Sequence, residues 1–238
     1  MRKHLIWVLG LVVVFATVGI ASAAPNTQSI VAKIAQKKRP SSTRVPISLD
    51  VNVFATKLAL VDFDKDVKFQ QKGYPTCDPT QFGSQSTTQD VKSACPDAIV
   101  GSGTATVILK SGPGLPPLTV HAQTIGANVK GNKVLLHSYT QEAGGVPLVG
   151  SFVKSTGGSK YGQMLSTPVP PLAGGQGVIS QFELKADKTV YRFKGKKLAI
   201  VSAKCSSKKL DFQARFTDDQ TPPNTAVGHT TAKCKKKG

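Results

Sequence analysis

The sequence is poor in glutamate and in tryptophan. Only two of its 13 acidic residues are Glu (Glu142 and Glu183), and Trp7 is the single Trp in 238 residues. Glycosidases place two carboxylates on either side of the scissile bond, and the two Glu are isolated from each other in the chain. These scarcities argue against a sugar-cleaving enzyme, and we expect no catalytic residues in this protein.

A triplet of aspartates has the spacing that begins a calcium loop. Asp62, Asp64 and Asp66 alternate along the chain, but an EF-hand also needs Gly at the sixth position and Glu at the twelfth. Val67 and Gly73 stand there instead, so the EF-hand is excluded. A looser calcium site using two of these carboxylates stays open as an alternative, and a solvated strand end is the preferred interpretation.

The histidines and Ser102 lack the spacing of catalytic or metal sites. His121, His137 and His229 form no pair at ligand spacing, although His121 and His137 could share a site on neighbouring strands. The sequence around Ser102 only superficially resembles the G-x-S-x-G motif of a nucleophile elbow, because Val100 stands at the position of the first Gly. Glycines within a strand more often mark a bulge or a close backbone approach. We therefore expect neither a metal ion nor a cofactor.

The N-terminal residues have the three parts of a secretory signal peptide. Arg2, Lys3 and His4 precede an apolar run over 5–20, and small residues follow over 21–24. The run is shorter than the ~20 residues that span a bilayer, so we expect cleavage after Ala23 or Ala24 rather than an anchor. Cleavage removes Trp7, Arg2 and Lys3, which lowers the formal charge from +18 to +16.

The four cysteines are consistent with export. An even number of cysteines in an exported chain favours disulfides, and no Cys/His group has the spacing of a zinc site. Three pairings are possible, of which we predict the sequence-local one, Cys77 with Cys95 and Cys205 with Cys234.

The spacing of apolar runs predicts an all-β fold. Short runs recur every 10 to 15 residues between Gly, Pro, Asn, Asp or Ser clusters. Leu210, Phe212, Ala214 and Phe216 alternate with polar residues, as in half-buried antiparallel strands. The sequence predicts about eleven strands, over 46–55, 58–63, 98–110, 118–124, 133–140, 148–154, 160–165, 178–185, 190–194, 198–203 and 210–217.

The domain organisation follows from these patterns. We expect a signal peptide over 1–23, a flexible basic lead-in over 24–44, and one β domain over 45–238 with a disulfide-tethered basic tail. A two-layer antiparallel sandwich or jelly roll is preferred, with an up-and-down barrel as the alternative. One short helix is expected over 86–94, where hydroxyl residues precede a helix-compatible stretch that Pro96 ends.

Positive charge gathers in the last fifth of the chain. If Cys205 pairs with Cys234, two groups of lysines come together on one positive face attractive to anionic polymers. The residues expected to bind such polymers are Lys196, Lys197, Lys208, Lys209, Lys233, Lys235, Lys236 and Lys237. A merely solubilising positive surface is the alternative interpretation, and sequence-specific nucleic-acid binding is not expected because interleaved aromatic residues are absent.

Several short motifs resemble one group of proteins. The segment over 95–105 (CPDAIVGSGTA), the preceding YPTC over 74–77, PPLAGG over 170–175 and the Lys204-Cys205 pair look similar to uncharacterised secreted proteins of high-GC Gram-positive bacteria. The resemblance would cover most of the mature chain. It implies export and a β fold, and it implies no activity or site residues, because none is known for the group.

The sequence therefore favours a secreted, non-catalytic, basic β domain that associates with anionic polymers of the cell envelope or the extracellular space. Two alternatives stay open. One is a carrier that holds an apolar ligand inside a β-barrel, and the other is an enzyme with an unrecognised site. We expect the mature chain to have no transmembrane segment.

Overall fold

The computed structural model describes residues 29–32, 46–50, 56–111, 115–186, 190–218, 223 and 225–234. The predicted signal peptide over 1–23, the remainder of the predicted lead-in, and Lys235, Lys236 and Lys237 lie outside the described residues.

The described chain is mostly antiparallel β structure, as predicted. A single α-helix, α1 (Thr88–Ala94), and three short 3-10 helices, η1 (Pro79–Gln81), η2 (Pro96–Ala98) and η3 (Ala173–Gly175), interrupt the strands. The strands are β1 (Ser29–Ala32), β2 (Pro46–Asp50), β3 (Leu58–Asp64), β4 (Val67–Phe69), β5 (Ile99–Leu109), β6 (Leu118–Val129), β7 (Lys133–Thr140), β8 (Gly144–Lys154), β9 (Tyr161–Pro168), β10 (Gly177–Ala186), β11 (Val190–Phe193), β12 (Lys196–Ala199), β13 (Val201–Ala203), β14 (Lys209–Thr217) and β15 (Thr225–Lys233).

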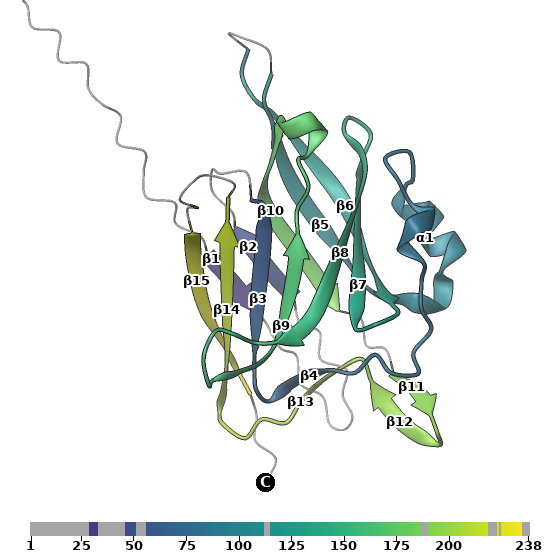
Figure 1. Cartoon of the computed structure of the whole chain (residues 1–238), viewed down its shortest axis with the longest axis vertical. Helices are drawn as coiled ribbons and strands as arrows, with labels where there is room; N and C mark the ends of the chain where they lie inside the picture. The colour runs from purple at the N-terminus through teal and green to yellow at the C-terminus, as the bar shows by residue number, and fades with distance from the viewer. Residues whose placement is uncertain are drawn as a thin grey trace, which may run out of the picture.

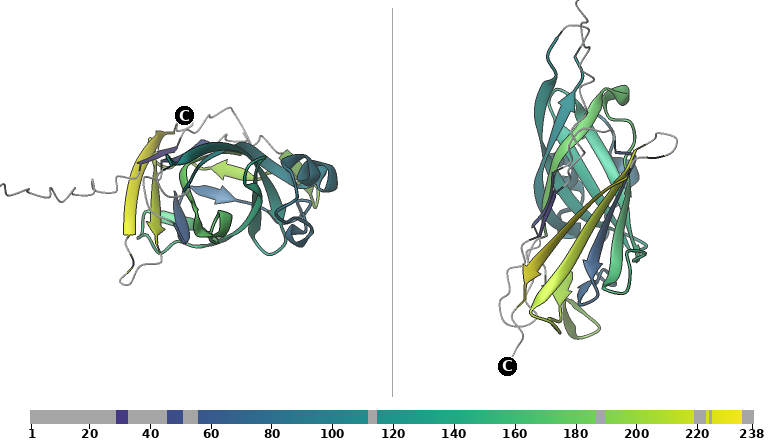
Figure 2. Two further views of the ribbon diagram at one scale, coloured as in Figure 1. Left: turned by 90° about the horizontal axis from the view of Figure 1, so that it is seen from above. Right: turned by 90° about the vertical axis from the view of Figure 1, so that its left-hand side faces the viewer.

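Eleven of these strands form one sheet that curls back on itself. Its order is β1-β2-β10-β5-β6-β7-β8-β9-β3-β14-β15, and β1 lies beside β15. The strands β14, β3, β9 and β8 face β2, β10 and β5 across the interior (Figure 1), and the view from above shows a ring (Figure 2). The strands β5 to β9 follow each other in an up-and-down meander. A single sheet therefore supplies both facing layers.

The main core lies between the facing walls. On β14, Leu210, Phe212, Ala214 and Phe216 are all buried, which confirms the alternation seen in the sequence. Phe212 packs edge-on against Phe63 of β3 at 6.3 Å between ring centroids. Burying one side chain of this size removes enough apolar surface to contribute about 1.5–3 kcal/mol.

A second, smaller core lies under the helix. Val91 of α1 packs with Ile125, Ala127 and Leu135 of β6 and β7, and the Cys77–Cys95 disulfide belongs to the same cluster. A capping box begins the helix, since Thr87 Oγ1 accepts a hydrogen bond from Asp90 N and Asp90 Oδ2 accepts one from Thr87 N. Both the predicted helix and the predicted disulfide are confirmed.

Three parts of the chain differ from the sequence-based predictions. Ser29–Ala32, within the predicted flexible lead-in, form strand β1 because their backbone pairs with β2. The predicted strand over 198–203 is split at Ile200, so that β12 pairs with β11 while β13 pairs with β4. The predicted basic tail begins with a regular strand, β15, whose buried positions hold only small residues such as Ala226, Gly228 and Ala232.

Substitution of Gly103 should destabilise the sheet where β5 meets β10. A Cβ atom at Gly103 would collide with the Glu183 carbonyl oxygen and lie 2.9 Å from Leu184 Cα, so the two backbones would have to separate. We expect Gly103→Ala to lower the free energy of unfolding by about 1–3 kcal/mol. Urea unfolding measures this, with Gly83→Ala as the control because a Cβ there meets nothing within 4 Å. Equal unfolding midpoints for the two variants would contradict the prediction.

Candidate functional site

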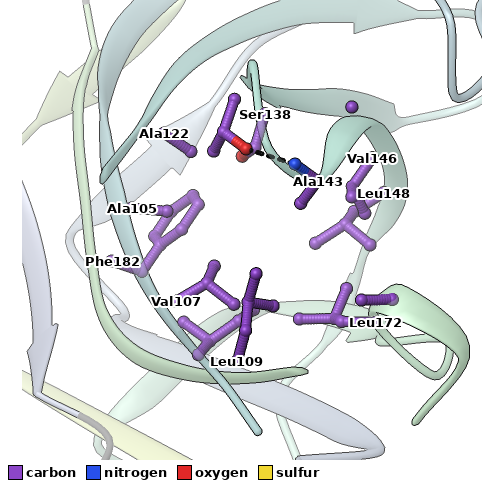
Figure 3. Close-up of a pocket in the computed structure, with 14 residues that line it drawn as sticks. Ala105, Val107, Leu109, Ala122, Ser138, Ala143, Val146, Leu148, Leu172 and Phe182 are labelled. Carbon is purple, nitrogen blue, oxygen red and sulfur yellow. Dashed lines mark hydrogen bonds between the residues drawn. The ribbon is translucent and has the colours of Figure 1, made fainter. Parts of the chain in front are cut away.

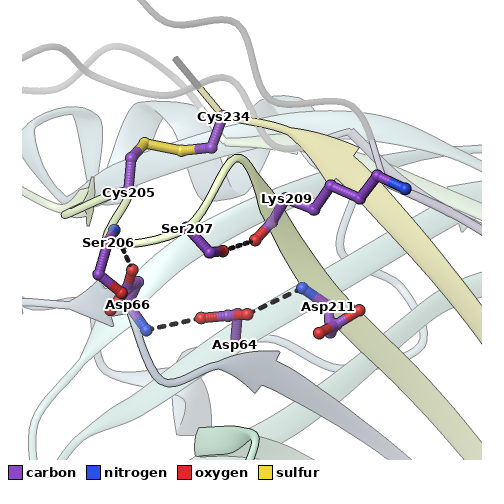
Figure 4. Close-up of a disulfide and its surroundings, with 8 residues drawn as sticks. All are labelled: Asp64, Asp66, Cys205, Ser206, Ser207, Lys209, Asp211 and Cys234. Carbon is purple, nitrogen blue, oxygen red and sulfur yellow. Dashed lines mark hydrogen bonds between the residues drawn. A yellow bond between two sulfur atoms is a disulfide. The ribbon is translucent and has the colours of Figure 1, made fainter. Parts of the chain in front are cut away.

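The second disulfide gathers three of the predicted lysines. Cys205 precedes β14 and Cys234 follows β15, and their pairing is confirmed (Figure 4). Next to it, Cys234 N donates a hydrogen bond to Lys208 O at 2.8 Å, and Lys209 lies opposite Lys233 in the β14–β15 ladder. All three lysines are exposed. The predicted juxtaposition of the two lysine groups thus holds for Lys208, Lys209 and Lys233.

Further lysines reach the same end of the molecule from other parts of the chain. Lys65 N donates to Lys160 O at 3.0 Å, which joins the β3–β4 turn to the β8–β9 loop. Lys204 N donates to Asp66 O at 3.0 Å, and Lys68 on β4 pairs with Ser202 on β13. We call the exposed set the basic end. It comprises Lys65, Lys68, Lys160, Lys204, Lys208, Lys209 and Lys233.

The structure says less about the other lysines that were predicted to bind anionic polymers. Lys196 is exposed on β12, which with β11 forms a separate hairpin at the same lower end of the molecule in Figure 1. Lys197 belongs to the same strand, and its side chain is not among those described, while Lys235, Lys236 and Lys237 lie outside the described residues. The sequence did not predict that Lys65, Lys68 or Lys160 belongs to the basic end, because only the pairing of distant strands brings them to it.

The carboxylates next to the basic end point inward and accept backbone hydrogen bonds. Asp64 Oδ1 accepts from Asp66 N and Asp64 Oδ2 from Asp211 N, each at 2.9 Å, and Asp66 accepts from Ser206 N (Figure 4). Asp64 and Asp66 are both buried. Hydrogen bonding from the Ser206 side chain, opposed by burial and aided by the Ser206 backbone and by nearby lysines, holds the pKa of Asp66 below its usual value.

The third aspartate of the triplet forms a buried ion pair. Asp62 is fully buried and contacts Arg215, with Nη2 to Oδ2 at 3.0 Å and Nε to Oδ2 at 3.1 Å. Ser155 Oγ also donates to Asp62 at 2.5 Å. Because Asp62, Asp64 and Asp66 each bind different internal donors, they tie strands and loops together rather than converge on a cation. Among the described residues, no group of His, Cys, Asp or Glu has the arrangement of a metal site.

Surface ion pairing is sparse in the described part of the chain. Besides the Asp62–Arg215 pair, only Lys185 and Glu183 approach within ion-pair distance, at 3.0 Å. None of the seven lysines of the basic end has a carboxylate partner among the described residues. The buried carboxylates of Asp64 and Asp66 lie close by but accept hydrogen bonds from backbone N–H groups instead.

The histidines and glutamates do not converge. His121 is exposed and contacts Thr106 Oγ1 at 3.2 Å, whereas His137 lies buried beneath the segment that precedes α1, so the two share no site. Glu183 pairs with Lys185 on β10, and Glu142 lies in the β7–β8 turn. Ser102 is exposed within β5, on a strand followed by no helix.

The interior of the curled sheet is closely packed. Three cavities of about 30, 70 and 50 Å³ lie between its walls, the smallest of which is shown in Figure 3. Their linings are almost wholly apolar, and Phe182 separates the first from the second. Each is well below the ~150 Å³ that holds a benzene ring, so none of these three cavities has room for a bulky ligand.

Ligand-sized space is found instead at the end of the sheet opposite the C-terminus. A cleft of about 620 Å³ lies between Thr56 and Lys57, before β3, and the segment 168–179 that connects β9 to β10. The η3 turn of this segment is at the top of Figure 1, and the C-terminus is at the bottom. The cleft falls within the range of volumes usual for small-molecule sites.

Comparison with family models, with curated proteins and with solved structures finds no match to this chain. None of the helices in the described ranges has the length and apolar character needed to cross a membrane. The two disulfides fit an oxidising compartment. The proposed function therefore rests on the chemistry of the described residues themselves.

Acid should destabilise the fold through His137. Its Nε2–H donates to Ser86 O at 2.8 Å, and its Nδ1 is buried without a hydrogen-bond partner among the described residues. Burial lowers the pKa of His137, although the Ser86 carbonyl and Asp90 oppose the shift. The neutral form is thus favoured in the folded state, and the unfolded chain takes up the proton at the ordinary pKa of 6.5.

We therefore expect the free energy of unfolding to fall as the pH is lowered below about 6.5, until the pH passes the folded-state pKa. Urea unfolding between pH 7.5 and 5.5 measures this, and His137→Gln should lose most of the dependence. His121→Gln is the control because His121 is exposed. A His137→Gln variant with the full pH dependence of the parent protein would rule out this residue as the source.

Proposed function

We propose that this protein is a secreted, non-catalytic module that binds anionic polymers of the cell envelope or the extracellular space through its basic end. The observation that carries the proposal is the gathering of seven exposed lysines, none with a carboxylate partner in the described structure, around one disulfide. The proposed secretion rests on the signal-peptide pattern and on the disulfides.

Electrostatics explains why such an end would bind polymers rather than single anions. One exposed Lys–anion pair is worth little in water, about 0–1 kcal/mol. A polymer that contacts several lysines at once releases several condensed counterions, and the gains add along the chain. Lysine ammonium groups act as point charges without the planar fork of arginine, so selectivity would follow the charge density of the polymer more than its chemical identity.

The disulfide and the buried carboxylates beneath the lysines favour a fixed arrangement of the backbone that carries them. The Cys205–Cys234 disulfide and the carboxylates of Asp64 and Asp66 hold the β3–β4 turn, the β13–β14 loop and the end of β15 together. Backbone positions that are ordered before binding lose less conformational entropy when the polymer arrives. This framework distinguishes the basic end from an unstructured lysine-rich tail.

Removal of three lysines from the basic end should weaken binding to a polyanion. We expect K204S/K208S/K209S to bind inorganic polyphosphate at least tenfold more weakly, with a salt dependence shallower by up to about three in log–log slope. The matched control is K57S/K92S/K110S, which removes the same charge from exposed lysines away from the basic end. Titration at a series of salt concentrations up to about 0.5 M, where screening is strong, measures both quantities. Equal weakening by the two triple variants, or binding that salt does not affect, would refute the proposal.

The two disulfides should differ in their effect on binding. Removing either one, as C205S/C234S or as C77S/C95S, should lower the free energy of unfolding by about 3 kcal/mol in the chain-entropy description. Only C205S/C234S should also weaken polyphosphate binding, because only that disulfide lies among the lysines of the basic end. Unfolding curves and polyphosphate titrations below the unfolding transition measure the two effects. Unchanged polyphosphate affinity in C205S/C234S would show that the framework is irrelevant to binding.

A further inference from the structure

The cleft at the opposite end of the molecule is separated from the apolar interior by a few aliphatic side chains. Ile179 lines the cleft and also the cavities of about 30 and 70 Å³. Val169 is shared by the cleft and the larger of these cavities, and Leu172 by the cleft and the smaller. These three aliphatic side chains thus form the wall shared by the cleft and the two cavities, and they give the cleft an apolar inner surface.

The turn around Leu172 is held firmly against β10. Leu172 is buried, and its carbonyl accepts hydrogen bonds from Gly175 N and Gly177 N, each at 2.9 Å. A Cβ atom at Gly177 would lie 2.9 Å from Leu172 Cβ, so glycine allows this turn to pack against β10. Val169, Leu172 and Ile179 thus present a fixed aliphatic surface to the cleft, and such a surface suits a hydrocarbon chain.

Two of the residues that line the cleft have polar side chains. Thr56 Oγ1 is buried and has no hydrogen-bond partner among the described residues, although it borders both the cleft and the cavity of about 70 Å³. Lys57 lines the cleft, and its side chain is exposed without an ion-pair partner in the described part of the chain. Its backbone is fixed, since Lys57 N donates to Thr217 O and Lys57 O accepts from Val169 N, each at 2.8 Å.

An unpaired buried hydroxyl is costly to a protein unless something else satisfies it. A hydroxyl donor and an ammonium in the lining of the same cleft match one carboxylate, and the aliphatic residues of that lining match the chain attached to it. We propose that the cleft binds one long-chain carboxylate. Its head accepts a hydrogen bond from Thr56 and pairs with Lys57, and its hydrocarbon chain packs against Val169, Leu172 and Ile179.

This site is separate from the basic end, so the two proposals can fail independently. Binding of a carboxylate through the basic end would be lost in K204S/K208S/K209S and at high salt. Binding in the cleft would persist in both cases, because most of its free energy comes from the buried chain.

The first test uses the oxidised, mature protein and a series of carboxylates. Octanoate, decanoate and dodecanoate, titrated calorimetrically at about 0.5 M salt, should bind with one-to-one stoichiometry. Their affinity should rise up to about fourfold for each added methylene. No saturable binding of dodecanoate, or an affinity independent of chain length, would overturn the proposal.

The second test uses three variants with matched controls. Ile179→Trp should weaken dodecanoate binding at least tenfold by filling the cleft, while Val227→Trp, on an exposed position of β15, should not. Thr56→Val should weaken it about tenfold and leave the unliganded protein at least as stable, since the hydroxyl it removes is unpaired. Exposed Thr231→Val is the control for that change.

The third test separates the headgroup from the chain. Lys57→Ser should weaken dodecanoate up to about fivefold and leave dodecan-1-ol unchanged, while Lys110→Ser should affect neither. If dodecanoate binds Ile179→Trp and Thr56→Val as tightly as the parent protein, the cleft is not the site. If it is lost in K204S/K208S/K209S, the anion binds at the basic end instead.

Discussion

The buried carboxylates of Asp64 and Asp66 are the constraint on which one end of this protein depends. Each accepts hydrogen bonds from backbone N–H groups that no neighbouring strand satisfies, and together they join the β3–β4 turn to Ser206 and Asp211. Such charge-assisted hydrogen bonds are stronger than neutral ones. Because these two carboxylates are buried and bind backbone N–H groups, neither forms an ion pair with the lysines around them, and the basic end keeps its ammonium groups unpaired in the described part of the chain.

The curled sheet separates two kinds of surface. One end is closed by the Cys205–Cys234 disulfide and is rich in lysine, whereas the other opens into an apolar cleft beneath the β9–β10 connection. The walls between them pack closely around cavities of about 30, 50 and 70 Å³. A module that held an anionic polymer at one end would leave the other end free for an apolar ligand, so the two proposed sites are compatible in one molecule.

The sequence predicted those elements whose signals are local. The alternation over β14, the capping box of α1 and the local disulfide pairing all depend on residues close together in the chain. The sequence failed at β1 and β15, where short length or buried Ala and Gly make the apolar pattern weak. The sequence also did not predict that Lys65 and Lys160 lie at the basic end or that Thr56 lines the cleft, because only the pairing of β3 with β9 and β14 brings them there. The cleft likewise needs segments more than a hundred residues apart.

A lysine footprint tests most directly whether an anionic polymer binds at the basic end. The oxidised, mature protein is acetylated briefly with and without a saturating amount of polyphosphate, and the modified lysines are identified by mass spectrometry. We expect protection of Lys65, Lys68, Lys160, Lys204, Lys208, Lys209 and Lys233, with Lys57, Lys92 and Lys110 modified equally in both samples. Protection spread evenly over all exposed lysines, or confined to Lys235, Lys236 and Lys237, would contradict it.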